Sequence, residues 1–290
     1  KRPRELIEQE EASIELNMQR AANQIIDSRL AAYLTRAGRY ADEGGLPFYP
    51  FLKSFEADFG GSLEKMQQVF AGLLPKLFNR HGLIVSVTLK QEEYPAFEEA
   101  FGALQQSFSQ EVFPTASLDW EIKPENEGLT SSSRVQYVGK GANFLRLGYR
   151  YTGSMAVLET LLRYDYFWTK VRVQGGAYGA FTGFNRNGFM YFGSYRDPNL
   201  CETLDVFDGT ADYAAHFTAS EREMDKFIIG TMSGVDTPLT PMMKGDAAAT
   251  CYLRGLTQED RQQRRDEILS TRQEDIRALA PLIAACMKEN

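Results

Sequence analysis

Apolar positions in the first part of the chain recur at helical spacing. Over residues 4–43 they fall at Leu6, Ile7, Ile14, Met18, Ile25, Leu30 and Leu34. This spacing predicts one long helix or a helix pair, stopped by the glycines at 44 and 45. Residues 48–59 and 62–79 repeat the pattern, so two more helices are expected there.

The pattern then changes to a strand, a helix and a polar stretch. Residues 83–89 are mainly apolar and β-branched, which predicts a strand, and residues 94–110 predict a helix. Residues 114–133 contain Pro124, Gly128 and three consecutive serines, which is typical of a linker. We therefore expect three parts: a mostly helical end of a preceding α+β domain (1–113), a linker (114–133) and a C-terminal α+β domain (134–290).

The third part mixes strands and helices without regular alternation. Strands are predicted at residues 134–138, 142–149, 177–184 and 189–195, the last two joined by a hairpin turn ending in Asn187 and Gly188. Helices are predicted from Ser154 to Arg172 and over residues 208–217, with capping boxes at Ser220 and Thr271 before two more. The pattern favours an α+β fold with a mixed or antiparallel sheet packed against helices.

Candidate chemistry lies where the long helix of this part meets the hairpin. Arg172 is predicted at the helix end and Tyr178 at the strand start, with Gly175 and Gly176 between them. Such a turn could aim a guanidinium and a phenol at one point and hold a carbonyl or carboxylate oxygen. Two glycines also let a peptide backbone approach closely. The alternative is a helix-capping arginine and a half-buried strand tyrosine.

Two other features have plain structural interpretations. The aromatic cluster of Tyr164, Tyr166, Phe167 and Trp168 lies at helical spacing, so we assign Trp168 to the core and leave Tyr166 open between core and peptide groove. The tripeptide 139–141 (Gly-Lys-Gly) lacks the residues of a phosphate-binding loop, which favours a turn between strands.

Composition and charge narrow the function classes. The net charge of −7 and pI of about 5.1 argue against a nucleic-acid partner. No apolar run approaches the roughly 20 residues of a membrane-spanning helix, so no membrane partner is expected. Three widely spaced cysteines fit neither a disulfide framework nor a metal knuckle. Buried free thiols in the cytoplasm or another reducing compartment are the expectation.

The two histidines do not form a metal site. His81 and His216 each lack a second histidine at ligand spacing, whereas a zinc site needs three protein ligands. We therefore predict that this segment alone binds no metal.

Several motifs in order give the chain a family resemblance. They are the run over residues 161–178, the sequence SYRDPNL at 194–200, SGVD at 233–236 and MKG at 243–245. Together they resemble the C-terminal part of presequence proteases, the large-chain branch of the pitrilysin and insulinase zinc metallopeptidases. The resemblance is dense from about Gly139 onward.

The resemblance implies a protease of two similar halves that close around a chamber, with this chain in the C-terminal half. The N-terminal half of the same protein would be its partner and would bind zinc through an inverted His-x-x-Glu-His motif and a distal Glu. By resemblance, Arg172 anchors the substrate, Tyr178 donates to the scissile carbonyl as it becomes an oxyanion, and Gly175 and Gly176 contact the peptide. Because the zinc motif is missing here, the segment alone is predicted to be inactive.

Two function classes follow. In the first, the chain is the C-terminal half segment of a zinc metalloendopeptidase that degrades short unstructured peptides. In the second, it is a noncatalytic structural or partner subunit with the same superfamily fold. The retained Arg172 and Tyr178 favour the first class, and loss of the zinc motif in the other half would favour the second.

Overall fold

A computed structural model describes residues 2–115, 117–131 and 133–289. Residues 116 and 132, which belong to the expected linker, lie outside the described residues. The described chain divides into two compact units. The sheet unit takes its described residues from 1–52, 120–236 and 261–290, and the helical unit takes them from 53–119 and 237–260. The domain boundaries expected from the sequence stay a prediction for a longer protein.

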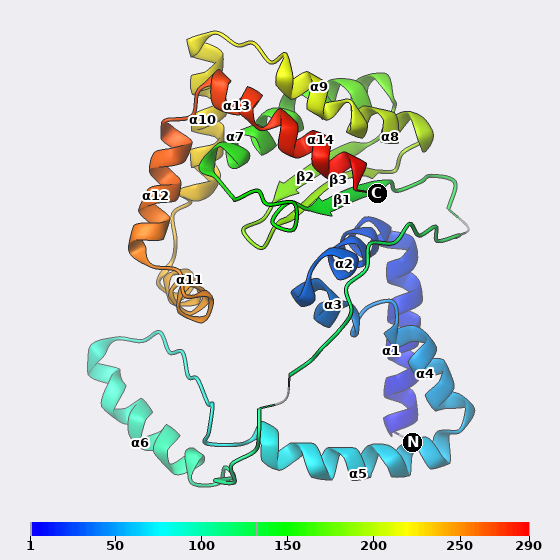
Figure 1. Cartoon of the computed structure of the whole chain (residues 1–290). Helices are drawn as coiled ribbons and strands as arrows, with labels where there is room; N and C mark the ends of the chain where they lie inside the picture. The colour runs from blue at the N-terminus through cyan, green and yellow to red at the C-terminus, as the bar shows by residue number, and fades with distance from the viewer. Residues whose placement is uncertain (1, 116, 132, 290) are drawn as a thin grey trace. The chain divides into compact units, whose positions relative to one another are not determined.

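The chain is helix-rich throughout (Figure 1). In the N-terminal part the helices are α1 (Arg2–Arg20), α2 (Ala22–Leu34), α3 (Arg36–Asp42), α4 (Phe48–Ala57), α5 (Phe59–Leu77), the short η1 (Gln91–Glu93) and α6 (Tyr94–Gln105). The strands are β1 (Gly139–Asn143), β2 (Gly179–Phe184) and β3 (Phe189–Tyr195). The helices after β1 are α7 (Gly153–Leu161), η2 (Leu162–Tyr166), η3 (Trp168–Gln174), α8 (Cys201–Asp208), α9 (Thr210–Ala215), α10 (Glu221–Val235), α11 (Pro241–Arg254), α12 (Gln258–Leu269), α13 (Gln273–Ala278) and α14 (Ala280–Lys288).

The sheet has three antiparallel strands in the order β1, β3, β2. The predicted hairpin is confirmed: β2 and β3 pair from Phe184 opposite Met190 to Gly179 opposite Tyr195. Its turn ends at Gly188, whose φ of 91° is strained for any residue with a side chain. An α+β fold with an antiparallel sheet packed against helices is thus confirmed at this coarse level.

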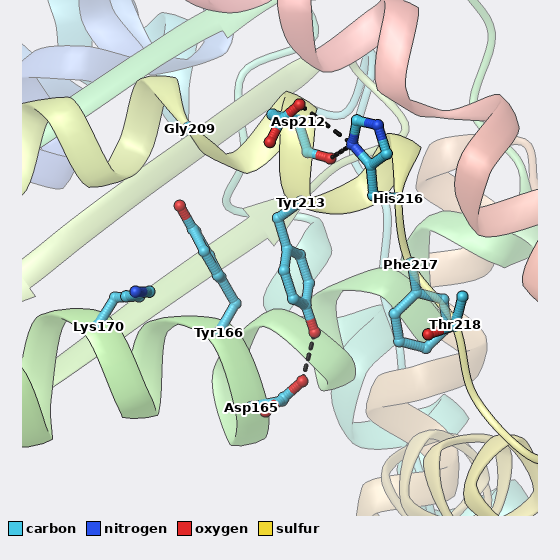
Figure 2. Close-up of a pocket in the computed structure, with 9 residues that line it drawn as sticks. All are labelled: Asp165, Tyr166, Lys170, Gly209, Asp212, Tyr213, His216, Phe217 and Thr218. Atoms are coloured by element: carbon cyan, nitrogen blue, oxygen red, sulfur yellow. Dashed lines mark hydrogen bonds and ion pairs between the residues drawn. The ribbon is translucent and has the colours of Figure 1, made fainter.

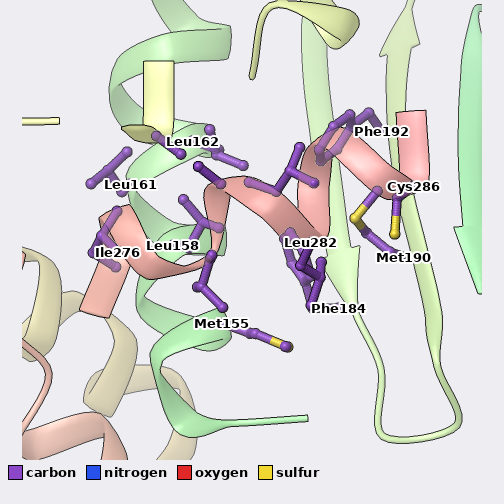
Figure 3. Packing of buried hydrophobic residues seen from close by; sticks show 14 of the residues in the cluster. Met155, Leu158, Leu161, Leu162, Phe184, Met190, Phe192, Ile276, Leu282 and Cys286 are labelled. Carbon is purple, nitrogen blue, oxygen red and sulfur yellow. The ribbon is translucent and has the colours of Figure 1, made fainter. Parts of the chain in front are cut away.

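One face of the sheet carries the main core (Figure 3). Met190 and Phe192 of β3 are fully buried there against Leu158 and Leu161 of α7 and Leu282 of α14. Burial of each such side chain stabilises the folded state by roughly 1.5–3 kcal/mol relative to leaving it exposed to water. This core fixes the hairpin against the long helix and so fixes the two elements that flank the Gly175–Gly176 turn.

The opposite face of the sheet is covered by α2. A side chain at Gly139 would place its Cβ 2.4 Å from Ile26 of α2, so glycine permits this close packing. The Asn143 amide also donates to the Leu34 carbonyl at 2.9 Å. The turn expected at residues 139–141 is therefore wrong, because these residues form β1.

Several boundaries also differ from the sequence predictions. The long helix or helix pair expected over residues 4–43 is three helices, α1, α2 and α3. The strands expected at 134–138 and 142–149 are replaced by the single strand β1. The Ser220 capping box is confirmed. The second one lies one residue later than expected, with the Arg272 backbone N–H donating to Asp275 at 2.8 Å.

In the helical unit, the strand predicted at residues 83–89 does not form. Residues 83–90 carry no strand, although their apolar side chains remain exposed, Ile84 at 57 %. A strand needs a partner for its backbone groups, and no described residue supplies one to this segment. The local sequence therefore favours a strand whose partner is not among the described residues.

Candidate functional site

The helix that leads to the Gly175–Gly176 turn is widened into a π-helix. After α7 the backbone continues as η2 and η3, both π-helical. At its end the Gly175 N–H donates to the Lys170 carbonyl at 3.0 Å, and the Ala177 N–H donates to the Val171 carbonyl at 3.1 Å. π-Helical turns are rare and occur frequently at functional sites. The 3.6-residue sequence pattern gave no sign of this one.

The turn itself requires its two glycines. A Cβ at Gly175 would lie 2.6 Å from the Val171 carbonyl oxygen, which is closer than real Cβ contacts come. Gly176 adopts a φ of 79° and has no such crowding. Gly175 is thus needed for close packing of the turn, and Gly176 for its backbone conformation.

Arg172 projects from η3 and lies between two aromatic rings. Its guanidinium carbon is 4.1 Å from the ring centroid of Trp168 and 5.7 Å from that of Tyr178. Trp168 is 44 % exposed, so its assignment to the core is wrong. One helical turn before Arg172, its indole instead supports the guanidinium through a cation–π contact.

Tyr178 is 66 % exposed, more than the half-buried alternative expected. Its backbone N–H donates to the Tyr195 carbonyl at 3.0 Å, and its ring meets the Tyr195 ring edge-on at 5.8 Å. Backbone and ring are therefore held by β3 while the hydroxyl side stays accessible.

Tyr166 is half-buried, and its hydroxyl donates to the Val206 carbonyl at 3.0 Å.

These residues surround an open recess of about 470 Å³, the site recess. Its lining residues are Arg172, Val173, Gly176, Ala177, Tyr178 and Arg196. The structure thus brings Arg172, Tyr178 and Gly176 of the sequence prediction together, whereas Gly175 lies outside the lining. The recess offers two guanidinium groups and one phenol.

A hydrogen-bonded loop after β3 fixes the other wall of the recess. Asp197 is fully buried, and its carboxylate accepts from the Asn199 N–H at 2.9 Å and the Thr203 hydroxyl at 2.8 Å. The Asn199 amide in turn donates to the Gly175 carbonyl at 2.6 Å. Sequence reasoning singled out neither Asp197 nor Asn199, although both fall in the motif at 194–200.

A second pocket of about 490 Å³ lies where η2 and η3 meet α9 (Figure 2). The rings of Tyr166 and Tyr213 stack there at 4.4 Å, and the Tyr213 hydroxyl donates to the Asp165 carboxylate. His216 contacts Asp212 at 3.1 Å on the exposed rim. This pocket does not share a lining residue with the site recess.

Metal donors are dispersed in the described chain. Within residues 2–115, 117–131 and 133–289, no three His, Cys, Asp or Glu side chains gather as a metal-ligand group. The His81 ring lies 3.1 Å from the Gln110 carbonyl oxygen.

Two further findings concern the burial of the cysteines and the apolar length of the helices. All three cysteines are free, but only Cys286 is buried, whereas Cys201 is exposed. The expectation of buried thiols thus holds for one residue. No helix in the described ranges is long and apolar enough to cross a membrane.

Comparison with known proteins gives one family. The family described as PreP C-terminal domain matches residues 126–290. The chain is 37% identical over 292 residues to Protein HypA of Clostridium perfringens, covering 99% of this chain and 29% of the relative. It is 31% identical over 285 residues to Presequence protease 1, chloroplastic/mitochondrial, of Arabidopsis thaliana, covering 97% and 26%. Presequence protease, mitochondrial, of Xenopus laevis is 28% identical over 142 residues, covering 49% and 14%.

The comparison adds two facts. The chain spans less than a third of the length of these relatives. Relatives from Arabidopsis, Xenopus and Schizosaccharomyces pombe are named as chloroplastic or mitochondrial proteins. The expectation of a cytoplasmic or other reducing compartment is corrected by these names.

Proposed function

The chain belongs to the presequence protease family, and on that basis we propose that it is the C-terminal half segment of a zinc metalloendopeptidase degrading short unstructured peptides. The observation that carries this proposal is the exposed pair of Arg172 and Tyr178 in one recess. A peptidase needs a donor for the oxyanion and an anchor for the substrate, and this pair offers both beside a glycine turn.

In this proposal each group has one task. Arg172, kept in place by Trp168, holds an oxygen of the peptide through its planar fork of donors. Tyr178 donates its hydroxyl proton in a hydrogen bond to the scissile carbonyl oxygen as negative charge develops there. Gly176 leaves the recess wall free of a side chain at the point where a peptide backbone would lie.

Zinc and the general base would come from the N-terminal half of the same protein, since the described residues of this chain do not gather metal ligands. When bound, zinc would polarise the scissile carbonyl and activate water. The chain's own groups would bind and orient the peptide. The segment alone is therefore proposed to be inactive.

The helical unit supports the proposal of a large covering partner. Neither α5 nor α6 has a buried residue. The exposed apolar side chains of α5 and its end are Val69, Phe70, Leu73, Leu74, Leu77 and Phe78. Contiguous apolar surface of this kind marks an interaction site. We propose the N-terminal half as its occupant, because the relatives are more than three times as long as this chain.

The test is peptide cleavage by the full-length protein. We expect chelator-sensitive cleavage of a quenched unstructured peptide, with kcat about 10²–10³-fold lower in Tyr178→Phe. Tyr164→Phe, an exposed tyrosine outside the recess lining, is the matched control and should cleave normally. Absence of cleavage by the folded wild-type protein would instead favour a noncatalytic structural or partner module.

A further inference from the structure

The site recess contains a second cation that the proposed function leaves unused. Arg196 lines it together with Arg172, and its lining includes no carboxylate. Among the described residues neither guanidinium takes part in an ion pair. The two positive charges thus share one recess without a negative charge in its lining. Their mutual repulsion favours binding of an anionic ligand there.

Arg196 holds an unfavourable backbone conformation to reach this position. Its φ of 49° is the one positive value among the non-glycine residues that the structure describes. Glycine adopts this region at no steric cost, and asparagine adopts it more readily than arginine. Residues held this way cluster at functional sites, where the surrounding structure imposes the strain.

The surrounding contacts impose it here. The next residue, Asp197, is fully buried, and its backbone N–H and carbonyl both pair with Gln136 at 2.8 Å. The preceding residue, Tyr195, accepts the Tyr178 N–H, and its ring lies 5.4 Å from the Arg196 guanidinium carbon. The backbone is thus fixed on both sides of Arg196 while its side chain stays exposed.

We propose that Arg196 is a second substrate-binding cation that, with Arg172, holds a carboxylate of the peptide beside Tyr178. This proposal rests on the peptidase function proposed above and adds a substrate preference to it. A guanidinium binds a carboxylate through two parallel hydrogen bonds, which gives direction as well as charge. The carboxylate is supplied either by an Asp or Glu side chain or by the free C-terminus of a short peptide.

The experiment uses the full-length protein and matched peptides. One pair differs only in a single Glu or Gln, placed at successive positions along the peptide. A second pair differs only in a C-terminal acid or amide. Cleavage kinetics give KM and kcat separately. Binding measured with chelator-treated protein gives Kd, because that protein does not cleave the peptide.

Three variants separate charge from structure. Arg196→Asn tolerates the positive φ and removes the charge, whereas Arg196→Lys keeps the charge without the planar fork. Arg146→Asn removes an exposed arginine from the loop after β1, outside the recess lining, and is the control. Thermal unfolding of Arg196→Asn should occur no earlier than in wild type, because backbone strain is relieved.

We expect Arg196→Asn to raise KM and Kd about tenfold for the peptide with the carboxylate and less than about twofold for its neutral twin. Arg196→Lys should recover part of the loss, and added salt should reduce the preference. Whether the Glu or the C-terminal pair responds identifies the source of the carboxylate.

The proposal is overturned if Arg196→Asn weakens binding of the charged and the neutral peptide equally, or of neither. In that case, chelator-sensitive cleavage by the wild-type protein would still support the peptidase function. Conversely, the folded protein could bind the charged peptide through Arg196 and yet fail to cleave it. That result would support the anion site and contradict only the proposed peptidase function.

Discussion

The guanidinium carbon of Arg172 lies 4.1 Å from the ring centroid of Trp168, one helical turn earlier in a π-helix. Because Trp168 is 44 % exposed, it contributes less to the core than to the direction of the arginine. A flexible arginine loses side-chain entropy on binding a ligand, and a preformed stack reduces that loss. In the proposed function, the pair would therefore prepare the site recess for its ligand.

This relationship predicts the effect of removing the indole. Trp168→Ala should raise KM about 3- to 10-fold, since an exposed cation–π contact is worth about 0.5–1 kcal/mol and more once the substrate excludes water. Trp168→Phe should retain part of the effect. The control is Trp120→Ala, because Trp120 also stacks on an arginine, Arg39, at 5.6 Å but away from the recess. An equal rise in KM in both alanine variants would contradict the prediction.

The sequence predicted the hairpin and one capping box well because both depend on neighbouring residues. An Asn-Gly turn determines the pairing of β2 with β3, and Ser220 finds its partner Glu223 three residues later. It also brought Arg172 and Tyr178 together correctly, since only the glycine turn separates them.

The remaining features depend on contacts distant in sequence. The π-helix ends where the Asn199 amide binds the Gly175 carbonyl, 24 residues away, and periodicity does not report such a bond. Gly139 lies in a strand because it pairs with Gly193 of β3, far along the chain, and α2 packs closely on it. The role proposed for Arg196 depends on its φ and its place in the recess, which the sequence pattern does not reveal.

A partly buried carboxylate predicts how the stability of the fold changes with pH. Asp27 of α2 has a carboxylate oxygen without a hydrogen-bond partner, and burial raises the pKa of Asp27 to about 6. Its charge also helps to raise the pKa of Tyr191 on β3 to about 12, after the larger effect of burial.

The sign follows from comparing the folded and unfolded states. Between about pH 4 and 6 the folded state holds the Asp27 proton more tightly than the unfolded state, so the stability it contributes is lost as pH rises through about 6. Asp27→Asn stays neutral, so it should be more stable than wild type by about 1–2 kcal/mol at pH 8, allowing for partial exposure, and by less at pH 5. Thermal unfolding at both pH values measures this difference. The exposed Asp225→Asn is the control, and the same gain at both pH values would count against the assignment.

The thiols should react in an order set by burial. Cys201 is exposed at the start of α8, whereas Cys286 of α14 is fully buried and burial raises its pKa to about 12. Because the thiolate is the reactive form, alkylation should modify Cys201 rapidly and Cys286 only after unfolding. Peptide mapping by mass spectrometry after a short exposure to reagent distinguishes the sites. Early modification of Cys286 in the folded protein would place α14 outside the core.

The segment at residues 83–89 gives a test of the proposed N-terminal half as the partner of this chain. Its residues favour a strand, yet no strand forms in the described chain, and its apolar side chains are exposed. If the N-terminal half covers the helical unit, it should also supply a strand that pairs with this segment, because unpaired backbone groups cannot be buried without cost. Backbone amides of residues 83–89 should then exchange with solvent within seconds in the isolated chain and at least about 100-fold more slowly in the full-length protein. The hairpin amides of β2 and β3, already paired within the sheet, serve as the internal reference and should be protected in both. Fast exchange at residues 83–89 in the full-length protein would contradict the prediction, because it would show that no strand pairs with this segment.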